Sequence, residues 1–142
     1  MSMRWFAVLA FLTVCAALPA RAEMVAMTAT LSAANEVPPV QSPGTGSAEV
    51  TVNTVTREVS WTIMVQGLTA PMSAAHFHGP STTGTNASIV VPIAKAGDPS
   101  PLKGSATLTP EQMPELLAGR WYINVHTPNN PPGEIRGQVV RK

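Results

Sequence analysis

The sequence has one cysteine, few charged residues and few aromatic residues. The cysteine, Cys15, lies inside an apolar run near the amino terminus, so the chain that follows this run contains no thiol. This absence excludes disulfide bonds and a thiolate zinc site in that part of the chain. The 9 lysine and arginine residues nearly balance the 8 acidic residues. Such a balance excludes the basic surface typical of proteins that bind nucleic acid or an anionic membrane.

A long hydrophobic run is also missing. The apolar stretch at residues 5–18 is too short to span a bilayer, and it is preceded by Arg4 and followed by Pro19. Residues 20–22 read Ala-Arg-Ala, which supplies the small residues that a signal peptidase site requires. We therefore predict a signal peptide over residues 1–22. The mature protein, residues 23–142, is expected to be periplasmic or secreted, with no membrane attachment after cleavage.

Motifs of nucleophilic catalysis are absent as well. The chain has no Gly-x-Ser-x-Gly motif and only one aspartate, Asp98, so a Ser-His-Asp triad has little support. A glycosidase pair such as Glu36 and Glu134 has no more support than chance among eight acidic residues. The sequence assigns no catalytic residue, and it favours a non-enzymatic role while leaving enzymatic activity open.

What the chain does contain is short segments of alternating apolar and polar residues, which predict β-strands with one buried face. Two of these segments, residues 48–53 and 59–66, should pair as a hairpin across residues 54–57. Pro92 lacks an amide hydrogen and therefore predicts an edge position for its strand. Further strands are expected at residues 89–93, 121–126 and 135–140.

Polar loops rich in proline and glycine separate these segments, at residues 37–46, 79–88, 96–104 and 127–133. One short helix is expected near residues 110–118, where Thr109 and Gln112 can form a capping box. The length suits a single domain. The predicted fold class is all-β: an immunoglobulin-like antiparallel β-sandwich or barrel with one short helix.

The three histidines are the residues with the clearest chemical potential. His76 and His78 are two apart on a predicted strand, so they project from one face while Phe77 enters the core. His126 lies at the end of another strand, on the face opposite its apolar neighbours. Imidazoles from two strands can share one metal ion, and imidazole ligands suit copper, with zinc as the alternative. The simpler interpretation is that the histidines only bond to loop carbonyls.

Other residues near these motifs offer additional ligands or hydrogen-bond partners for the histidines. A thioether could come from Met72, and the carboxylates of Glu36 and Glu134 could bind the metal or orient an imidazole. Both Asn124 and Arg136 are polar residues beside the same motifs. For Met72 and Glu134, packing and local hydrogen bonding are the competing explanations.

Three motifs in a fixed order resemble one known family. Residues 31–39 (LSAANEVPP), 75–80 (AHFHGP) and 121–127 (WYINVHT), which leads to 133–137 (GEIRG), are similar to the CHRD domain, named after chordin. The similarity covers about residues 27–140. It implies an exported all-β domain, and it places His76, His78 and His126 in the family pattern together with polar residues. Those polar residues are Asn35, Glu36, Glu134 and Arg136.

Three functions are consistent with these observations. The favoured one is an exported domain that holds or delivers a metal ion, copper rather than zinc, at His76, His78 and His126. The second is an interaction module for a protein or glycan, with structural histidines. The third is a copper-dependent redox enzyme. No protein partner can be assigned from the sequence.

Overall fold

A computed structural model describes residues 21–142. The predicted signal peptide, including Cys15, lies outside the described residues except for its last two positions. Within the described chain, no helix has the length and apolar character needed to cross a membrane.

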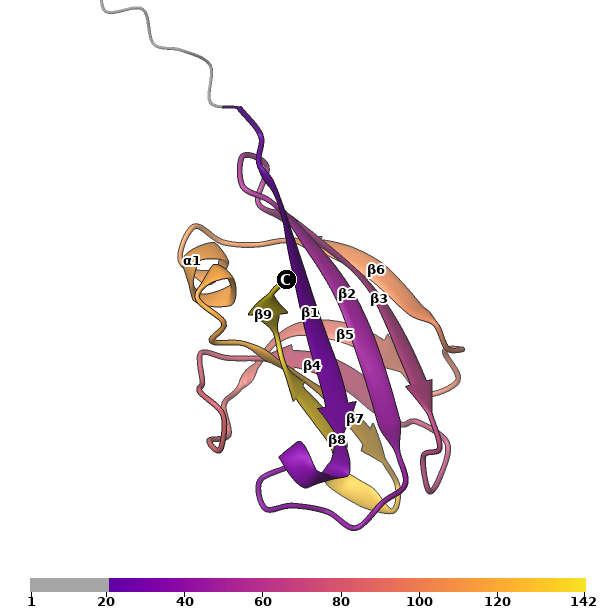
Figure 1. Cartoon of the computed structure of the whole chain (residues 1–142). Helices are drawn as coiled ribbons and strands as arrows, with labels where there is room; N and C mark the ends of the chain where they lie inside the picture. Colours follow the sequence, from indigo (N-terminus) through magenta and orange to yellow (C-terminus); the bar gives the residue numbers. More distant parts are fainter. Residues whose placement is uncertain (1–20) are drawn as a thin grey trace, which may run out of the picture.

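The described chain forms nine β-strands, one 3-10 helix (η1) and one α-helix. Their bounds are β1 (Met24–Ser32), η1 (Ala33–Asn35), β2 (Thr45–Asn53), β3 (Glu58–Gln66), β4 (Ala74–His78), β5 (Ile89–Lys95), β6 (Leu102–Thr107), α1 (Gln112–Leu117), β7 (Tyr122–Thr127), β8 (Asn130–Gln138) and β9 (Val140–Arg141). The predicted all-β class with one short helix is therefore confirmed (Figure 1).

The strands form one antiparallel sheet in the order β5-β4-β7-β8-β1-β2-β3-β6, with β9 paired to β1. The two halves of this order meet where β8 pairs with β1, at Ser32 and Arg136. The sheet curls at this junction into a nearly closed barrel whose halves pack against each other (Figure 1). Trp61 of β3 and Phe77 of β4 meet across the interior, with ring centroids 5.3 Å apart.

The alternating segments behave as predicted. β2 and β3 pair as a hairpin in which Val50 lies opposite Trp61, and both side chains are buried. The strand that contains Pro92 is β5, which pairs only with β4 and lies at one end of the sheet. The missing amide hydrogen of Pro92 is consistent with this edge position.

The predicted capping box is also present before α1. The Gln112 backbone N–H donates to Thr109 Oγ1 at 3.2 Å, and the Thr109 backbone N–H donates to Gln112 Oε1 at 2.9 Å. Gly119 follows the helix with a φ of 73°, the left-handed conformation that commonly ends helices.

The prediction for the last strand was wrong at its start. β8 begins at Asn130 rather than at residue 135, and residues 127–133 are not a long loop, because Thr127 pairs directly with Asn130. The Thr127 hydroxyl accepts the Asn130 backbone N–H at 3.2 Å and closes the turn. A bulge between Val125 and Thr127 accommodates the irregular stretch.

Both faces of β7 are buried, which alternation did not indicate. Trp121, Ile123 and Val125 face the core, while Tyr122 and Asn124 on the opposite face are only 2% and 3% exposed. The cover comes from two loops. Residues 79–88 lie over this face, and Asn86 Nδ2 donates to the Val37 carbonyl of the loop after η1 at 3.0 Å. A polar layer is thereby enclosed between the sheet and its loops.

Candidate metal centre

His76 and His78 of β4 and His126 of β7 meet on the outer face of the sheet. β4 and β7 are neighbours, with Ala74 opposite His126 and His76 opposite Asn124. Phe77, between the two β4 histidines, is fully buried in the core, as predicted. One ring nitrogen from each histidine can be chosen so that all three lie within 4.8 Å of one another. The two histidine motifs, 50 residues apart in the chain, therefore form one cluster.

Two backbone carbonyls fix the orientation of two of the rings. Nδ1 of His78 lies 2.9 Å from the Ala87 carbonyl, and Nδ1 of His126 lies 2.9 Å from the Pro131 carbonyl. Since a carbonyl only accepts, both Nδ1 atoms carry the hydrogen in the neutral rings, and this assigns the lone pair to Nε2. Carbonyl bonds of this kind orient histidine ligands in metal sites. The loop-carbonyl bonds expected of structural histidines are thus present, and they leave the Nε2 lone pairs of both rings pointing away from these carbonyls.

The third ring is already paired with a neighbour. His76 Nδ1 lies 3.2 Å from His126 Nε2, and the tautomer of His126 makes His76 the donor. His78 Nε2 is buried and has no hydrogen-bond partner. Nitrogens that share one ion at 2.0–2.1 Å lie about 3.3–3.6 Å apart. A metal ion would replace the hydrogen between His76 and His126 and would draw the more distant nitrogen of the cluster inward.

The electrostatics of the site favour neutral imidazoles. Burial lowers the pKa of His76, and the neighbouring His126 and His78 lower it further. Burial also lowers the pKa of His78, and this effect outweighs the opposing hydrogen bond to the Ala87 carbonyl. Neutral rings keep the lone pairs that a metal ion requires.

The proposed additional residue Asn124 lies beside the cluster and is bonded to Glu36. Asn124 Nδ2 donates to Glu36 Oε2 at 3.1 Å. The remaining oxygens, Glu36 Oε1 and Asn124 Oδ1, are buried without a partner. Burial raises the pKa of Glu36 to about 7, against smaller lowering effects of Asn124 and Arg136. The raised pKa and the bond to Asn124 together make Glu36 a poorer carboxylate ligand than an exposed glutamate.

Arg136 and His78 enclose the ring of Tyr122. The His78 ring is stacked on Tyr122 at 5.0 Å between centroids, and the Arg136 guanidinium carbon lies 3.5 Å from the ring centroid. β4 and β8 flank β7 on opposite sides, so the two groups contact opposite faces of the ring. The Tyr122 hydroxyl accepts the Ala87 backbone N–H at 3.0 Å. This stack holds His78 and the loop that orients it.

Glu134 lies in a separate network of hydroxyl and amide groups. Its oxygens accept hydrogen bonds from Ser42, Thr127, Asn130 and both the hydroxyl and the backbone N–H of Thr69. Although burial alone would raise its pKa, these bonds lower the pKa to about 2. Glu134 thus anchors loops around the site, and it is not a member of the histidine cluster.

Met72 has surroundings that favour packing. It packs against the core and lines a small cavity of about 100 Å³ with Val65, Leu68 and Leu102. None of the three histidines lines this cavity.

Several groups that build the site were missed in the sequence. Tyr122 was not among the candidate site residues, and the Ala87 and Pro131 carbonyls carry no side-chain signature. The WYINVHT segment already contained the signal for Tyr122, because an aromatic residue between polar positions on an outward face indicates a covered surface.

Comparisons with known proteins give one match. The model of the CHRD domain family matches residues 27–139, which include all three histidines. No curated protein matches the chain. No solved structure matches it either. Since the match covers most of the chain and agrees with the motifs and the fold, the protein belongs to the CHRD domain family.

Proposed function

We propose that this domain binds one copper ion through His76, His78 and His126 and holds or delivers it outside the cytoplasm, with zinc as the alternative metal. The observation that carries the proposal is the convergence of three imidazoles, two of which keep the lone pair on Nε2 because a backbone carbonyl accepts from Nδ1. Such an arrangement needs little reorganisation to accept a metal ion.

The donor set favours copper over harder ions. Carboxylate and carbonyl oxygens are the ligands of magnesium and calcium, whereas imidazole suits copper and zinc. The metal-ligand group found in the described residues consists of histidines alone. Glu36 and Glu134 are committed to other partners. Three nitrogen ligands leave a coordination position for an exogenous group.

The exposure of the site supports a role in holding or transferring the ion. His78 is buried, while His76 and His126 are partly exposed. A bound ion would therefore be held from one side. Its other side would remain accessible from solvent to a coordinating atom of a partner protein.

Metal titration of the purified protein tests the proposal. We expect one equivalent of Cu(II) to bind, and His76→Asn or His126→Asn to weaken binding by at least about tenfold, through loss of one of three ligands. The double variant His126→Asn/Thr62→His is the matched control. It keeps three histidines in the described chain, but the third lies at an outward position of β3 instead of in the cluster. Unchanged affinity in the single variants, or full recovery in the double variant, would contradict the site.

The other two functions predict different outcomes in the same experiments. For an interaction module with structural histidines, His76→Asn would reduce stability without changing metal uptake. For a redox enzyme, the copper-loaded protein would turn over superoxide or peroxide faster than an equal amount of free copper. We expect neither result.

A further inference from the structure

A second polar site lies on the outer face of the sheet, away from the histidines. A cavity of about 310 Å³ is formed over β1, β8 and the 79–88 loop, with Thr28, Thr30, Asn35, Thr83, Arg136 and Gln138 among its lining residues. None of the three histidines lines it. Tyr122 separates the two places, because His78 and Arg136 contact opposite faces of its ring.

Arg136 gives this cavity its charge. The residue is 2% exposed, and its guanidinium donates to the Asn86 side chain at 2.9 Å and to the Thr85 carbonyl at 2.6 Å. A guanidinium has five N–H donors, so three are left without a partner within residues 21–142. Over the same residues, the ion pair found is Lys142 with Glu49, and no carboxylate is paired with Arg136.

A buried guanidinium without an ion pair is costly, and a planar carboxylate is its best-matched partner. Glu36 interacts electrostatically with Arg136, but its carboxyl is bonded to Asn124 and forms no ion pair with the guanidinium. An anionic ligand that enters the cavity would supply the missing negative charge.

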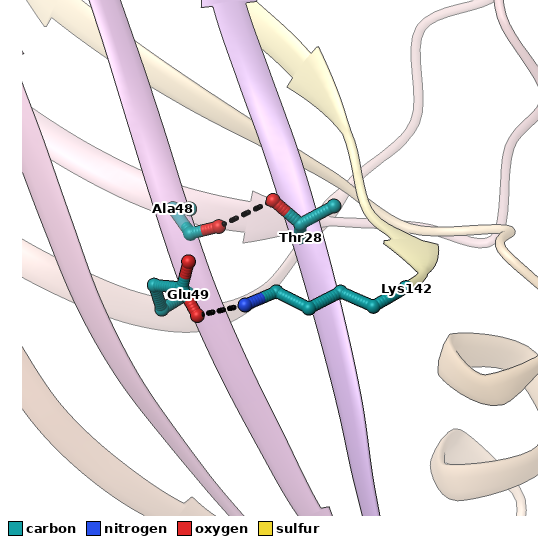
Figure 2. A network of polar contacts seen from close by, with 4 residues as sticks. All are labelled: Thr28, Ala48, Glu49 and Lys142. Atoms are coloured by element: carbon teal, nitrogen blue, oxygen red, sulfur yellow. Dashed lines mark hydrogen bonds and ion pairs between the residues drawn. The ribbon is translucent and has the colours of Figure 1, made fainter.

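The other walls of the cavity offer neutral hydrogen-bond acceptors. Thr28 Oγ1 donates to the Ala48 carbonyl at 3.0 Å and keeps its lone pairs for a ligand (Figure 2). Asn35 uses Nδ2 to donate to the Thr30 and Arg136 carbonyls, which leaves its Oδ1 free to accept. Figure 2 also shows Lys142 crossing β1 beside Thr28 to reach Glu49. Hydroxyl groups on the ligand would satisfy these acceptors.

We propose that this cavity binds a small hydroxylated carboxylate of the sugar-acid type, with the carboxylate on Arg136 and the hydroxyl groups toward Thr28, Thr30 and Asn35. The cavity shares no lining residue with the histidine cluster, and Tyr122 lies between Arg136 and His78.

Binding of D-glucuronate to the purified, metal-free protein tests the proposal, with glucose and acetate as probes that keep only the hydroxyls or only the charge. We expect glucuronate to bind at least about tenfold more tightly than either probe in titration calorimetry, because only glucuronate uses both parts of the site. The proposal would be overturned if glucuronate showed no saturable binding at millimolar concentration, or if the three compounds bound with equal affinity.

Variants locate the site and separate it from the metal centre. Arg136→Lys should weaken glucuronate binding by at least about tenfold, because lysine lacks the planar fork. Arg136 also holds the 79–88 loop, so Thr30→Gln provides a second variant that fills the cavity from its exposed wall. Thr62→Gln, on the outer face of β3, is the matched control and should leave binding unchanged.

The histidine variant His126→Asn completes the set. It should leave glucuronate affinity unchanged even where copper binding is lost. Loss of glucuronate binding in this variant, or unchanged binding in Thr30→Gln, would refute the assignment of the ligand to the Arg136 cavity.

Discussion

Glu36 and Glu134 are both buried, and their surroundings shift their pKa values in opposite directions. Glu134 accepts five hydrogen bonds, which stabilise its charged form and lower its pKa to about 2. Glu36 accepts one side-chain bond, from Asn124, and burial raises its pKa to about 7. At residue scale, the number of donors decides which charge state of a buried carboxyl is the stable one.

Glu134→Gln should reduce stability at neutral pH. The amide removes the charge that Ser42, Thr69 and Thr127 stabilise and brings two N–H donors next to them, so we expect a loss of roughly 2–4 kcal/mol in the free energy of unfolding at pH 7. Because the folded pKa of Glu134 is lowered, its contribution is complete above the ordinary pKa of 4.5 and disappears as the pH falls toward 2. Urea unfolding at a series of pH values from about 2.5 to about 7 measures this convergence.

The exposed Glu58 of β3 provides the control for this prediction. Glu58→Gln should change the free energy of unfolding by less than about 0.5 kcal/mol. A Glu134→Gln penalty that stays constant down to acid pH would show that the carboxylate charge is not its source.

Glu36→Gln should have the opposite effect. The folded pKa of Glu36 is raised, so the wild-type protein loses stability as the pH rises from 4.5 through about 7. The neutral amide avoids this loss, and its N–H can donate to the unpartnered Oδ1 of Asn124. We expect the variant to exceed the wild type by roughly 2–3 kcal/mol above pH 8 and to match it near pH 4, in the same urea experiment. Lower stability than the wild type above pH 8 would contradict the neutral form of Glu36.

At the scale of the elements, β8 depends on one glycine beside the site. Gly133 has a φ of 142°, and a Cβ at this position would lie 2.6 Å from Glu36 Oε1. Gly133→Ala should therefore destabilise the protein by about 2 kcal/mol or more, through strain and displacement of the Glu36–Asn124 pair. Thermal unfolding measures the loss. Gly84→Ala is the control for backbone strain alone, because Gly84 also has a positive φ but has open space around it.

The strands with one buried face could be predicted from the sequence, and the covered face could not. Alternation located the β2–β3 hairpin and placed Phe77 in the core between two outward histidines. Alternation of apolar and polar residues predicts one buried face per strand. Tyr122 and Asn124 lie on the other face and are buried by loops from distant parts of the chain. The same limit applies to the site. The three histidines were identified, but the pairing of β4 with β7 and the carbonyls that orient the rings depend on contacts remote in sequence.

For the whole molecule, a metal bound by β4 and β7 should stabilise the fold. A ligand at 100 times its Kd adds about 2.7 kcal/mol when it binds only the folded state. For a domain of this size we expect Cu(II) to raise Tm by roughly 8–15 °C. Differential scanning fluorimetry with and without a chelator measures the shift. His126→Asn should abolish it, and a shift of equal size in that variant would show that copper acts elsewhere.

The predicted signal peptide meets the domain at Ala22, close to the first strand. The Glu23 carbonyl accepts the Thr54 backbone N–H at 3.0 Å, and β1 begins at Met24, so residues directly after Ala22 contribute to the sheet. Cleavage after Ala22 would keep this contact, whereas cleavage inside β1 would remove strand residues paired with β2. We expect intact-mass analysis of the exported protein to give Glu23 as its first residue. Ala22→Leu should leave the precursor uncut, because the peptidase needs a small residue there. An exported protein whose first residue is not Glu23, or normal cleavage of the Ala22→Leu variant, would contradict the predicted cleavage site.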